Sequence, residues 1–186
     1  MPEPPAGPAR GAGAAAGERV DLLVLIGFMA AGKTTVGRKV AKRLGWRFID
    51  LDEEIVRRTG ATIAELFRER GEPAFRALER RLTDELSCEQ RVVLAPGGGW
   101  VTDPAAFDRL SASSVVVWLR VSPEEAVRRA RRSRTKRPLL AGPDRLERAR
   151  TILAAREPMY RKAHHVIDVD GRTAAEVAAD IARLVE

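Results

Sequence analysis

A glycine-rich loop that ends in a lysine is the stretch of this chain with the most definite chemistry. Residues Gly27 to Thr34 read GFMAAGKT, which matches the spacing G-x-x-x-x-G-K-[ST] of a Walker A phosphate loop. The backbone N–H groups of such a loop, with the positive end of the following helix, form an anion site. Lys33 adds a charge for the outer phosphates, and the Thr34 hydroxyl can bind Mg²⁺. The pattern therefore predicts nucleotide binding.

Two aspartates separated by one residue, Asp50 and Asp52, lie at the end of a predicted strand, Trp46 to Leu51. If the chain is extended there, the side chains of Asp50 and Asp52 point to opposite sides, so one can face a metal ion and the other a substrate. A carboxylate near Mg²⁺ can organise its waters, and a second can accept a proton from an attacking hydroxyl. The alternative is that Asp52 caps a helix while Asp50 is solvated.

Three consecutive glycines and two arginines are further candidates. Because glycines cost backbone entropy, the run Gly97-Gly98-Gly99 predicts a loop that other groups approach closely, although a flexible turn is the alternative. Arg76 lies in a helix-like stretch, where an arginine by itself is most often a solvated charge. Arg156 is a candidate anion clamp, since the planar guanidinium group can pair with a carboxylate through two hydrogen bonds, and a solvated charge is again the alternative.

The net charge of +7 comes mainly from one run of the sequence. Residues 128–137, RRARRSRTKR, carry seven positive charges and no acid. Like charges repel one another and gain from an anionic ligand, and the Pro and Gly residues of 138–143 mark a mobile segment. A basic mobile segment that closes over phosphates suits a kinase lid. The alternative is a solvated helix face.

Strand-like and helix-like stretches alternate along the chain. The stretches Leu22–Ile26, Arg91–Ala95 and Ser114–Leu119 are largely apolar along their length, which predicts a parallel sheet covered by helices on both faces, a three-layer α/β/α arrangement. Ligands of such folds bind beyond the carboxyl ends of the strands. Since the phosphate loop, the aspartate pair and the glycine run all follow strands, we expect these three sites to converge.

Helix boundaries are marked as well. Thr62 and Glu65 form a capping box. Gly71 is expected to end the helix that begins there, and a longer helix is expected from Glu72 to about residue 88. Asp103-Pro104 is typical of a further helix start.

Length and composition indicate one domain. A chain of 186 residues is large enough for a single core. Residues 1–19, rich in Ala, Gly and Pro, are expected to form a disordered tail before a single domain at 20–186. The single cysteine excludes an internal disulfide, and no apolar run approaches the roughly 20 residues of a membrane-spanning helix. We expect a cytoplasmic monomer with no nucleic-acid or membrane partner.

Taken together, six motifs resemble those of the shikimate kinases, small kinases of the nucleoside monophosphate kinase type. The motifs follow the family's order between residues 21 and 185 and are GFMAAGKTT, FIDLDEEI, GEPAFRALE, PGGGWV, KRPLL and AAREPMY. The resemblance implies ATP-dependent phosphorylation of the 3-hydroxyl of shikimate, a step of aromatic amino-acid biosynthesis. It also implies a P-loop NTPase fold with a five-stranded parallel sheet, a lid at about 131–143 and a substrate-binding helical segment at about 52–80.

The resemblance assigns roles by position. Asp52 would bind the shikimate hydroxyls and act as base, and Lys33 and Arg137 would be the other catalytic residues. Thr34 would ligate Mg²⁺, and Asp50 would hold a metal-bound water. The residues expected at shikimate are Asp52, Arg76, Gly97, Gly98, Gly99 and Arg156. Those expected at ATP are Ala30, Ala31, Gly32, Lys33, Thr34, Thr35, Arg129 and Arg137, with Arg129 near the adenine.

The chain departs from the family pattern at Ala30, where members commonly have glycine. The Walker pattern does not require glycine there, so we expect alanine to be tolerated unless the residue needs a positive φ. Two other readings of the motifs stay open. One is a kinase of the same fold with another small acceptor, such as gluconate or a nucleoside monophosphate. The other is a nucleic-acid-binding regulatory NTPase module that uses the basic run.

Overall fold

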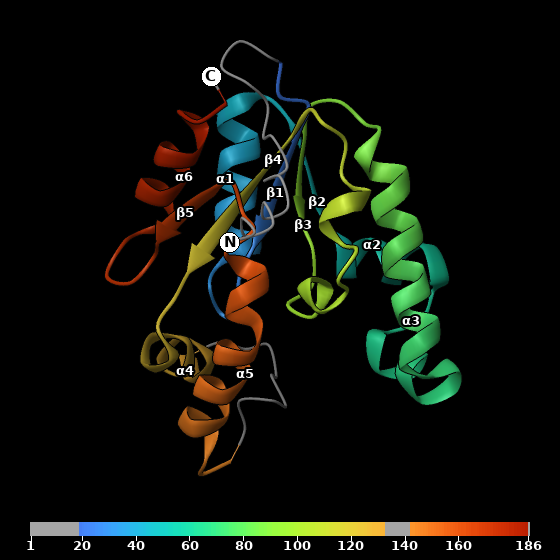
Figure 1. Ribbon diagram of the computed structural model, residues 1–186, viewed down its shortest axis with the longest axis vertical. Helices are drawn as coiled ribbons and strands as arrows, with labels where there is room; N and C mark the ends of the chain where they lie inside the picture. The colour runs from blue at the N-terminus through green and yellow to red at the C-terminus, as the bar shows by residue number, and fades with distance from the viewer. Residues whose placement is uncertain (1–18, 133–141, 186) are drawn as a thin grey trace, which may run out of the picture.

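The structure is a computed structural model and describes residues 19–132 and 142–185. Its centre is a five-stranded parallel sheet with strand order β2-β3-β1-β4-β5 (Figure 1). In chain order the elements are β1 (Leu22–Ile26), α1 (Lys33–Leu44), β2 (Arg47–Asp50), α2 (Leu51–Thr59), α3 (Ile63–Ser87), β3 (Val92–Ala95), η1 (Trp100–Thr102), η2 (Phe107–Arg109), β4 (Ser114–Arg120), α4 (Pro123–Arg132), α5 (Arg145–Tyr160), β5 (His165–Asp168) and α6 (Ala174–Ala182). Residues 1–18 of the predicted tail, and residues 133–141 of the lid predicted at about 131–143, lie outside the described residues.

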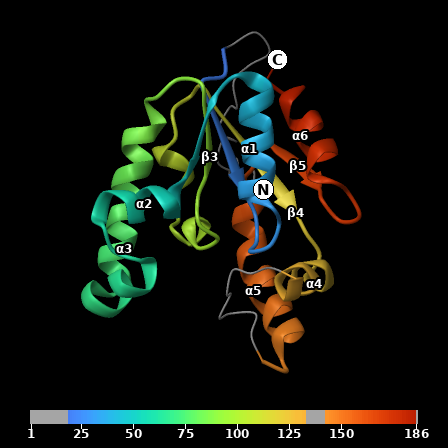
Figure 2. The same cartoon turned by 180° about the vertical axis from the view of Figure 1, so that it is seen from behind.

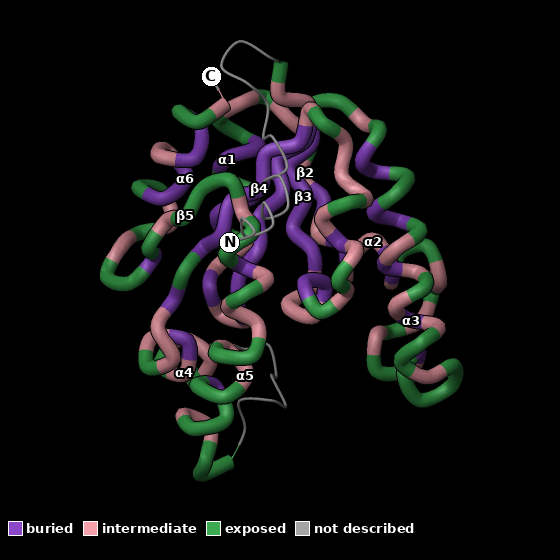
Figure 3. The backbone as a smooth tube through the Cα atoms, viewed as in Figure 1, coloured by how far each residue is buried: buried purple, intermediate pink, exposed green. Residues whose placement is uncertain are grey.

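The three inner strands, β3, β1 and β4, are apolar along most of their length because helices cover both faces of the sheet. Every residue of β1 and β3 is buried, and so are the first six residues of β4 (Figure 3). The edge strand β5 is mostly exposed. A fully buried parallel strand has no polar face to alternate with, which is why the sequence shows continuous apolar runs and not a period of two.

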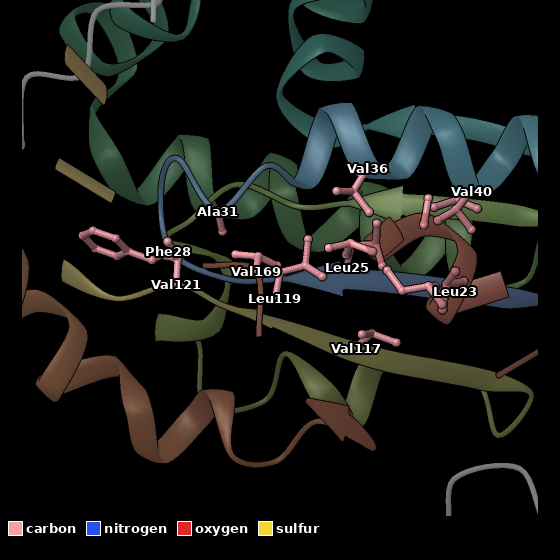
Figure 4. Close-up of a cluster of buried hydrophobic side chains, with 14 of the residues drawn as sticks. Leu23, Leu25, Phe28, Ala31, Val36, Val40, Val117, Leu119, Val121 and Val169 are labelled. Atoms are coloured by element: carbon pink, nitrogen blue, oxygen red, sulfur yellow. The ribbon is translucent and has the colours of Figure 1, made fainter. Parts of the chain in front are cut away.

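The two faces of the sheet carry separate hydrophobic clusters. Leu23 and Leu25 of β1 pack with Val36 and Val40 of α1 (Figure 4). Helix α6 lies beside α1 (Figure 2) and adds Ile181 to the same cluster. The alternate side chains of β1 join the other cluster, to which α2, α3 and α5 contribute. The three-layer prediction is therefore confirmed. Within the described ranges, no helix combines the length and the apolar content needed to cross a membrane.

The long segment α3 is two helices joined at a glycine. Gly71 has φ of 77° and ψ of 169°, so the helical backbone is interrupted there. Glycine adopts this conformation more easily than any other residue. The predicted capping box is present, since Thr62 accepts from the N–H of Glu65 and Glu65 accepts from the N–H of Thr62. The break predicted at Gly71 is thus confirmed, and the second helix carries Arg76.

The helix predicted to start at Asp103-Pro104 is wrong. The chain there forms turns between η1 and η2. The carboxylate of Asp103 accepts from the N–H of Ala105 at 3.0 Å, and its carbonyl oxygen accepts from the N–H of Ala106 at 3.0 Å. A short polar side chain that bonds its neighbouring backbone stabilises a turn as readily as a helix start, and here the turn is what forms.

The carboxyl ends of the three neighbouring strands lie at one edge of the sheet. Asp50, the last residue of β2, pairs with Ala95, the last residue of β3, and β3 in turn pairs with β1. The phosphate loop follows β1, α2 follows β2, and the glycine run follows β3. The predicted convergence of the three candidate sites is confirmed by this register.

Candidate active site

The phosphate loop connects β1 to α1. Gly32 precedes the helix with φ of 96°, and Lys33 is the first helical residue. The ammonium group of Lys33 donates to the carbonyl oxygens of Gly27 at 2.8 Å and Phe28 at 3.3 Å, so it lies against the loop. The first turn of α1 contains no acidic residue. No negative side chain in that turn would repel an anion at the positive end of the helix, and a phosphate site requires this.

Ala30 adopts the left-handed backbone conformation, with φ of 64°. Alanine is expected to be tolerated at this position unless the residue needs a positive φ, and the residue does have a positive φ. An L-residue with a Cβ atom is disfavoured there by roughly 1–2 kcal/mol, whereas glycine is not. The phosphate loop of this chain therefore contains a strained residue at a position where glycine would be unstrained.

Replacing Ala30 with glycine is expected to stabilise the protein without nucleotide by about 1 kcal/mol, because relief of the strain outweighs the added entropy of the unfolded chain. Thermal unfolding should show the melting temperature rising by about 2–4 °C. Ala31→Gly is the matched control, since Ala31 is fully buried and has no positive φ. That variant should be destabilised, and a stabilisation of both variants would contradict the strain at Ala30.

The Thr34 side chain is tied to the end of β2. Its hydroxyl donates to Oδ2 of Asp50 at 2.7 Å. The other carboxylate oxygen of Asp50 accepts from the N–H groups of Asp52 at 3.1 Å and Glu53 at 3.3 Å, which caps α2. The helix is therefore capped by Asp50 and not by Asp52, and Asp50 is not a merely solvated side chain.

Asp52 lies in the first turn of α2, so the chain is not extended through the aspartate pair. The two side chains consequently do not point to opposite sides, and both line the same cleft. Burial is the main cause that raises the pKa of Asp52, and the Asp50 carboxylate adds to the rise. Lys33 and Arg76 oppose it without cancelling it. Asp52 is thus a carboxylate with increased proton affinity beside the phosphate loop.

Arg76 is paired with a buried acid that the sequence interpretation missed. Its guanidinium group donates to the carboxylate of Glu79, three residues further along α3, and more weakly to Glu72 at 3.2 Å. The Glu79 side chain is only 3% exposed. Burial raises the pKa of Glu79, Arg76 lowers it, and Asp52 raises it further. Spacing i, i+3 to an arginine was the available signal, but that spacing is common on exposed helices.

The glycine run passes close to these side chains. A Cβ atom on Gly97 would lie 3.0 Å from Oδ1 of Asp52, and one on Gly99 would lie 2.5 Å from Nη2 of Arg76. The carbonyl oxygen of Gly98 accepts from Nη1 of Arg156 at 2.8 Å. The loop therefore has close neighbours that a side chain would displace, which favours the close-approach interpretation over a flexible turn.

The basic run is partly neutralised by one acid on the same helix. Glu125 of α4 accepts from Arg128 and Arg129, each at 2.6 Å, and these hydrogen bonds, with Arg128 first, lower the pKa of Glu125 to about 2. Arg129 also donates to the carbonyl oxygens of Ala31 at 3.3 Å and Val169 at 2.6 Å, so it lies against the phosphate loop. Arg137 lies outside the described residues, and its role stays a prediction.

One cleft of about 1020 Å³ joins most of these groups. It runs from the aspartates and the first two glycines, across the phosphate loop, to the start of α6. The predicted residues that line it are Ala30, Ala31, Gly32, Lys33, Thr34, Thr35, Asp50, Asp52, Gly97, Gly98 and Arg129. Arg76, Gly99 and Arg156 are not among the lining residues, but Arg156 donates to the lining residue Gly98, and Arg76 lies against Gly99, the next residue of the loop.

A parallel α/β sheet with a phosphate loop after its first strand, and with an acid and arginines beside that loop, defines a P-loop nucleotide-binding enzyme. The family model described as shikimate kinase matches residues 29–186. This chain belongs to the shikimate kinase family.

Individual relatives agree with that assignment. The chain is 45% identical to the shikimate kinase of Thermus thermophilus over 159 residues, which are 86% of each chain. It is 44% identical to that of Acinetobacter baylyi, covering 88% of this chain and 91% of the relative. The solved shikimate kinase of Acinetobacter baumannii in complex with shikimate has a TM-score of 0.81 and 38% identity, covering 91% of this chain and 95% of that chain.

The fold is shared more widely than the family. A gluconokinase from Sinorhizobium meliloti superimposes with a TM-score of 0.57 at 20% identity, covering 90% of this chain and 95% of that chain. Identity at that level shows a common fold and nothing about the acceptor. The acceptor must be argued from the side chains of the site.

Proposed function

We propose that the protein transfers the γ-phosphoryl group of ATP to the 3-hydroxyl of shikimate, giving shikimate 3-phosphate and ADP. The observation that carries the proposal is the meeting of Asp52, Arg76 and Arg156 at one glycine loop beside a phosphate loop. A carboxylate and two guanidinium groups suit an acceptor with one acid group and several hydroxyls. Membership of the shikimate kinase family supports the same acceptor.

Asp52 is the proposed base. Its carboxylate would accept hydrogen bonds from the shikimate hydroxyls and take the proton of the 3-hydroxyl as the phosphoryl group arrives. The raised pKa of Asp52 suits this role, because a more basic carboxylate accepts the proton of an alcohol more readily. Lys33 and the N–H groups of the loop would hold the outer phosphates, and phosphoryl transfer depends mainly on such alignment and charge neutralisation.

Arg76 and Arg156 are the proposed clamp for the substrate carboxylate, with the backbone of Gly98 as a third contact. Two arginines approach the glycine run from different helices, α3 and α5. A planar guanidinium group can hold a carboxylate through two parallel hydrogen bonds. A clamp of this kind fixes the ring of the acceptor, so that the 3-hydroxyl is held within reach of Asp52.

The same site fits Mg²⁺. Magnesium prefers oxygen ligands and is usually held by one or two protein groups together with substrate phosphates. Thr34 and Asp50, whose side-chain oxygens lie 2.7 Å apart at the phosphate loop, supply that donor set. We propose that Thr34 binds the ion and that Asp50 orients a water beside it. When bound, the ion would neutralise charge on the phosphates.

Arg137 is the proposed lid arginine. Replacing it with alanine is expected to lower kcat by about tenfold or more, because one cation that neutralises the transferring phosphate is lost. KM for shikimate should change much less. Steady-state kinetics with each substrate varied in turn measure both effects, and a wild-type kcat in this variant would remove Arg137 from the catalytic set.

The acceptor is tested by a coupled assay for ADP release. Shikimate, gluconate and several nucleoside monophosphates are supplied in turn with ATP and Mg²⁺. Shikimate is expected to stimulate ADP release well above the others, and no stimulation by shikimate would contradict the proposal. Release that is indifferent to every acceptor, with salt-sensitive binding of RNA or DNA, would favour a regulatory NTPase module.

The proposed enzyme works as a monomer. The described part of one chain contributes Asp52, Arg76 and Arg156 from three different helices to the acceptor site, so a second subunit is not required to complete it. Sedimentation with and without substrates tests this proposal, and a stable dimer would contradict it. A cytoplasmic location, without nucleic-acid or membrane partners, stays a prediction from the sequence.

A further inference from the structure

A buried hydrogen bond links α3 to the end of the glycine run. The indole Nε1–H of Trp100 donates to Oγ1 of Thr83 at 3.1 Å. Thr83 is fully buried and Trp100 is 4% exposed. The hydroxyl of Thr83 in turn donates to the carbonyl oxygen of Glu79 at 2.8 Å, which fixes the direction of its lone pairs toward the indole. Neither Thr83 nor Trp100 belongs to the phosphate loop or to the residues proposed to touch shikimate. Glu79 is connected to the acceptor site through its ion pair with Arg76.

The glycine run needs an anchor outside itself. Gly97, Gly98 and Gly99 have no side chains, so the packing of their neighbours must determine where their backbone lies. Trp100 is the next residue, and its backbone N–H donates to the carbonyl oxygen of Gly97 at 3.0 Å. The indole of Trp100 also contacts the ring of Phe107, with centroids 5.6 Å apart. Trp100 therefore joins the loop to the protein interior.

Thr83, which accepts the hydrogen bond from Trp100, lies on the same helix as Arg76. Arg76, Glu79 and Thr83 follow one another at spacings of three and four residues on α3, so they share one face of the helix. The same face thus holds Arg76 through Glu79 and holds the glycine loop through Thr83 and Trp100. The position of Arg76 and the position of the glycine loop therefore both depend on the second helix of α3.

We infer that Thr83 and Trp100 are positioning residues that set the register between the glycine loop and Arg76, and thereby the affinity for the acceptor. The inference rests on the proposed function. A buried tryptophan also needs a hydrogen-bond partner for stability alone. That simpler role predicts a loss of stability with unchanged kinetic constants, whereas positioning predicts a change confined to one substrate.

Thr83→Val, which keeps the side-chain shape and removes the hydroxyl, is expected to raise KM for shikimate by about three- to tenfold, the range that one lost hydrogen bond allows. KM for ATP should stay at its wild-type value, because the loop wall and not the phosphate loop is displaced. Thr83→Ser keeps the hydroxyl and should restore KM for shikimate. Trp100→Phe removes the donor and should raise KM in the same direction, so the inference can be tested if Thr83→Val folds poorly.

Ser87→Ala is the matched control. Ser87 is a mostly buried hydroxyl one turn further along α3 that donates to the carbonyl oxygen of Asp84, and its removal should leave both KM values unchanged. Unchanged KM for shikimate in both Thr83→Val and Trp100→Phe would overturn the inference, as would an equal rise of both KM values. Wild-type protein that releases no ADP with shikimate would instead contradict the proposed function itself.

Discussion

Replacing Asp52 with asparagine is expected to lower kcat by about 10²- to 10⁴-fold, the usual contribution of a positioned general base. The amide keeps the shape of the side chain and cannot take the proton of the acceptor hydroxyl. Affinity for ATP should stay close to the wild-type value, because the phosphate loop and Lys33 are unchanged. Titration with nucleotide and steady-state kinetics together separate the two effects.

An acid away from the cleft provides the control for this prediction. Glu89, which precedes β3, pairs with Arg47 at 2.5 Å, and neither residue lines the cleft. Glu89→Gln should therefore leave kcat essentially unchanged. If the affinity of Asp52→Asn for ATP fell in parallel with kcat, Asp52 would belong to the nucleotide side of the site and not to the acceptor side.

The Asp52→Asn variant should also be more stable than the wild-type protein at neutral pH. Because burial raises the pKa of Asp52 in the folded state, its charged form lowers the stability of the fold at pH values above that pKa. The stability advantage of Asp52→Asn should begin near the ordinary aspartate pKa of about 3.9 and be complete above the raised pKa. Below that window the wild-type carboxyl is protonated in both states, and the two melting temperatures should converge.

Replacing Arg76 with alanine should weaken shikimate binding and the fold together. Loss of a charged hydrogen-bond donor from the clamp is expected to raise KM for shikimate by about 10- to 100-fold. The buried Glu79 carboxylate loses its partner, which should lower the free energy of unfolding by about 3 kcal/mol, the lower end for a broken buried pair. Chemical denaturation and steady-state kinetics measure the two effects independently.

A double variant separates these two effects. In Arg76→Ala/Glu79→Gln no buried charge is left unpaired, so stability should recover while KM for shikimate stays high. Arg81→Ala is the surface control, since Arg81 lies on the same helix and pairs with exposed Glu85 at 3.2 Å. Recovery of shikimate affinity in the double variant would show that Arg76 acts through Glu79 and not on the substrate.

The fold was predictable because its signals are local or periodic. Buried parallel strands are continuous apolar runs, and the phosphate loop has a fixed spacing directly after the first of them. The capping box at Thr62 and the break at Gly71 depend on residues within a few positions of one another. The Asp103-Pro104 start failed because the same local chemistry also serves a turn.

The parts of the site that the sequence did not reveal depend on packing between distant segments. Glu79 looks like any acid three residues after an arginine, but it is buried, and the glycine loop is one of the segments that lie against it. Asp50 caps α2, and not Asp52 as the alternative has it, because the helix starts at Leu51, two residues before the start that a cap at Asp52 would give. The strain at Ala30 is a property of φ, which a residue type alone does not give.

The position of the transferred phosphate tests the central claim most directly. Wild-type protein is incubated with ATP, Mg²⁺ and shikimate, and the purified product is examined by two-dimensional ³¹P–¹H correlation NMR. We predict a single phosphate monoester whose phosphorus couples to the proton on C3 of the ring. Coupling to the proton of another hydroxyl-bearing carbon, or inorganic phosphate with unmodified shikimate, would contradict the assignment of Asp52, Arg76 and Arg156 to this acceptor.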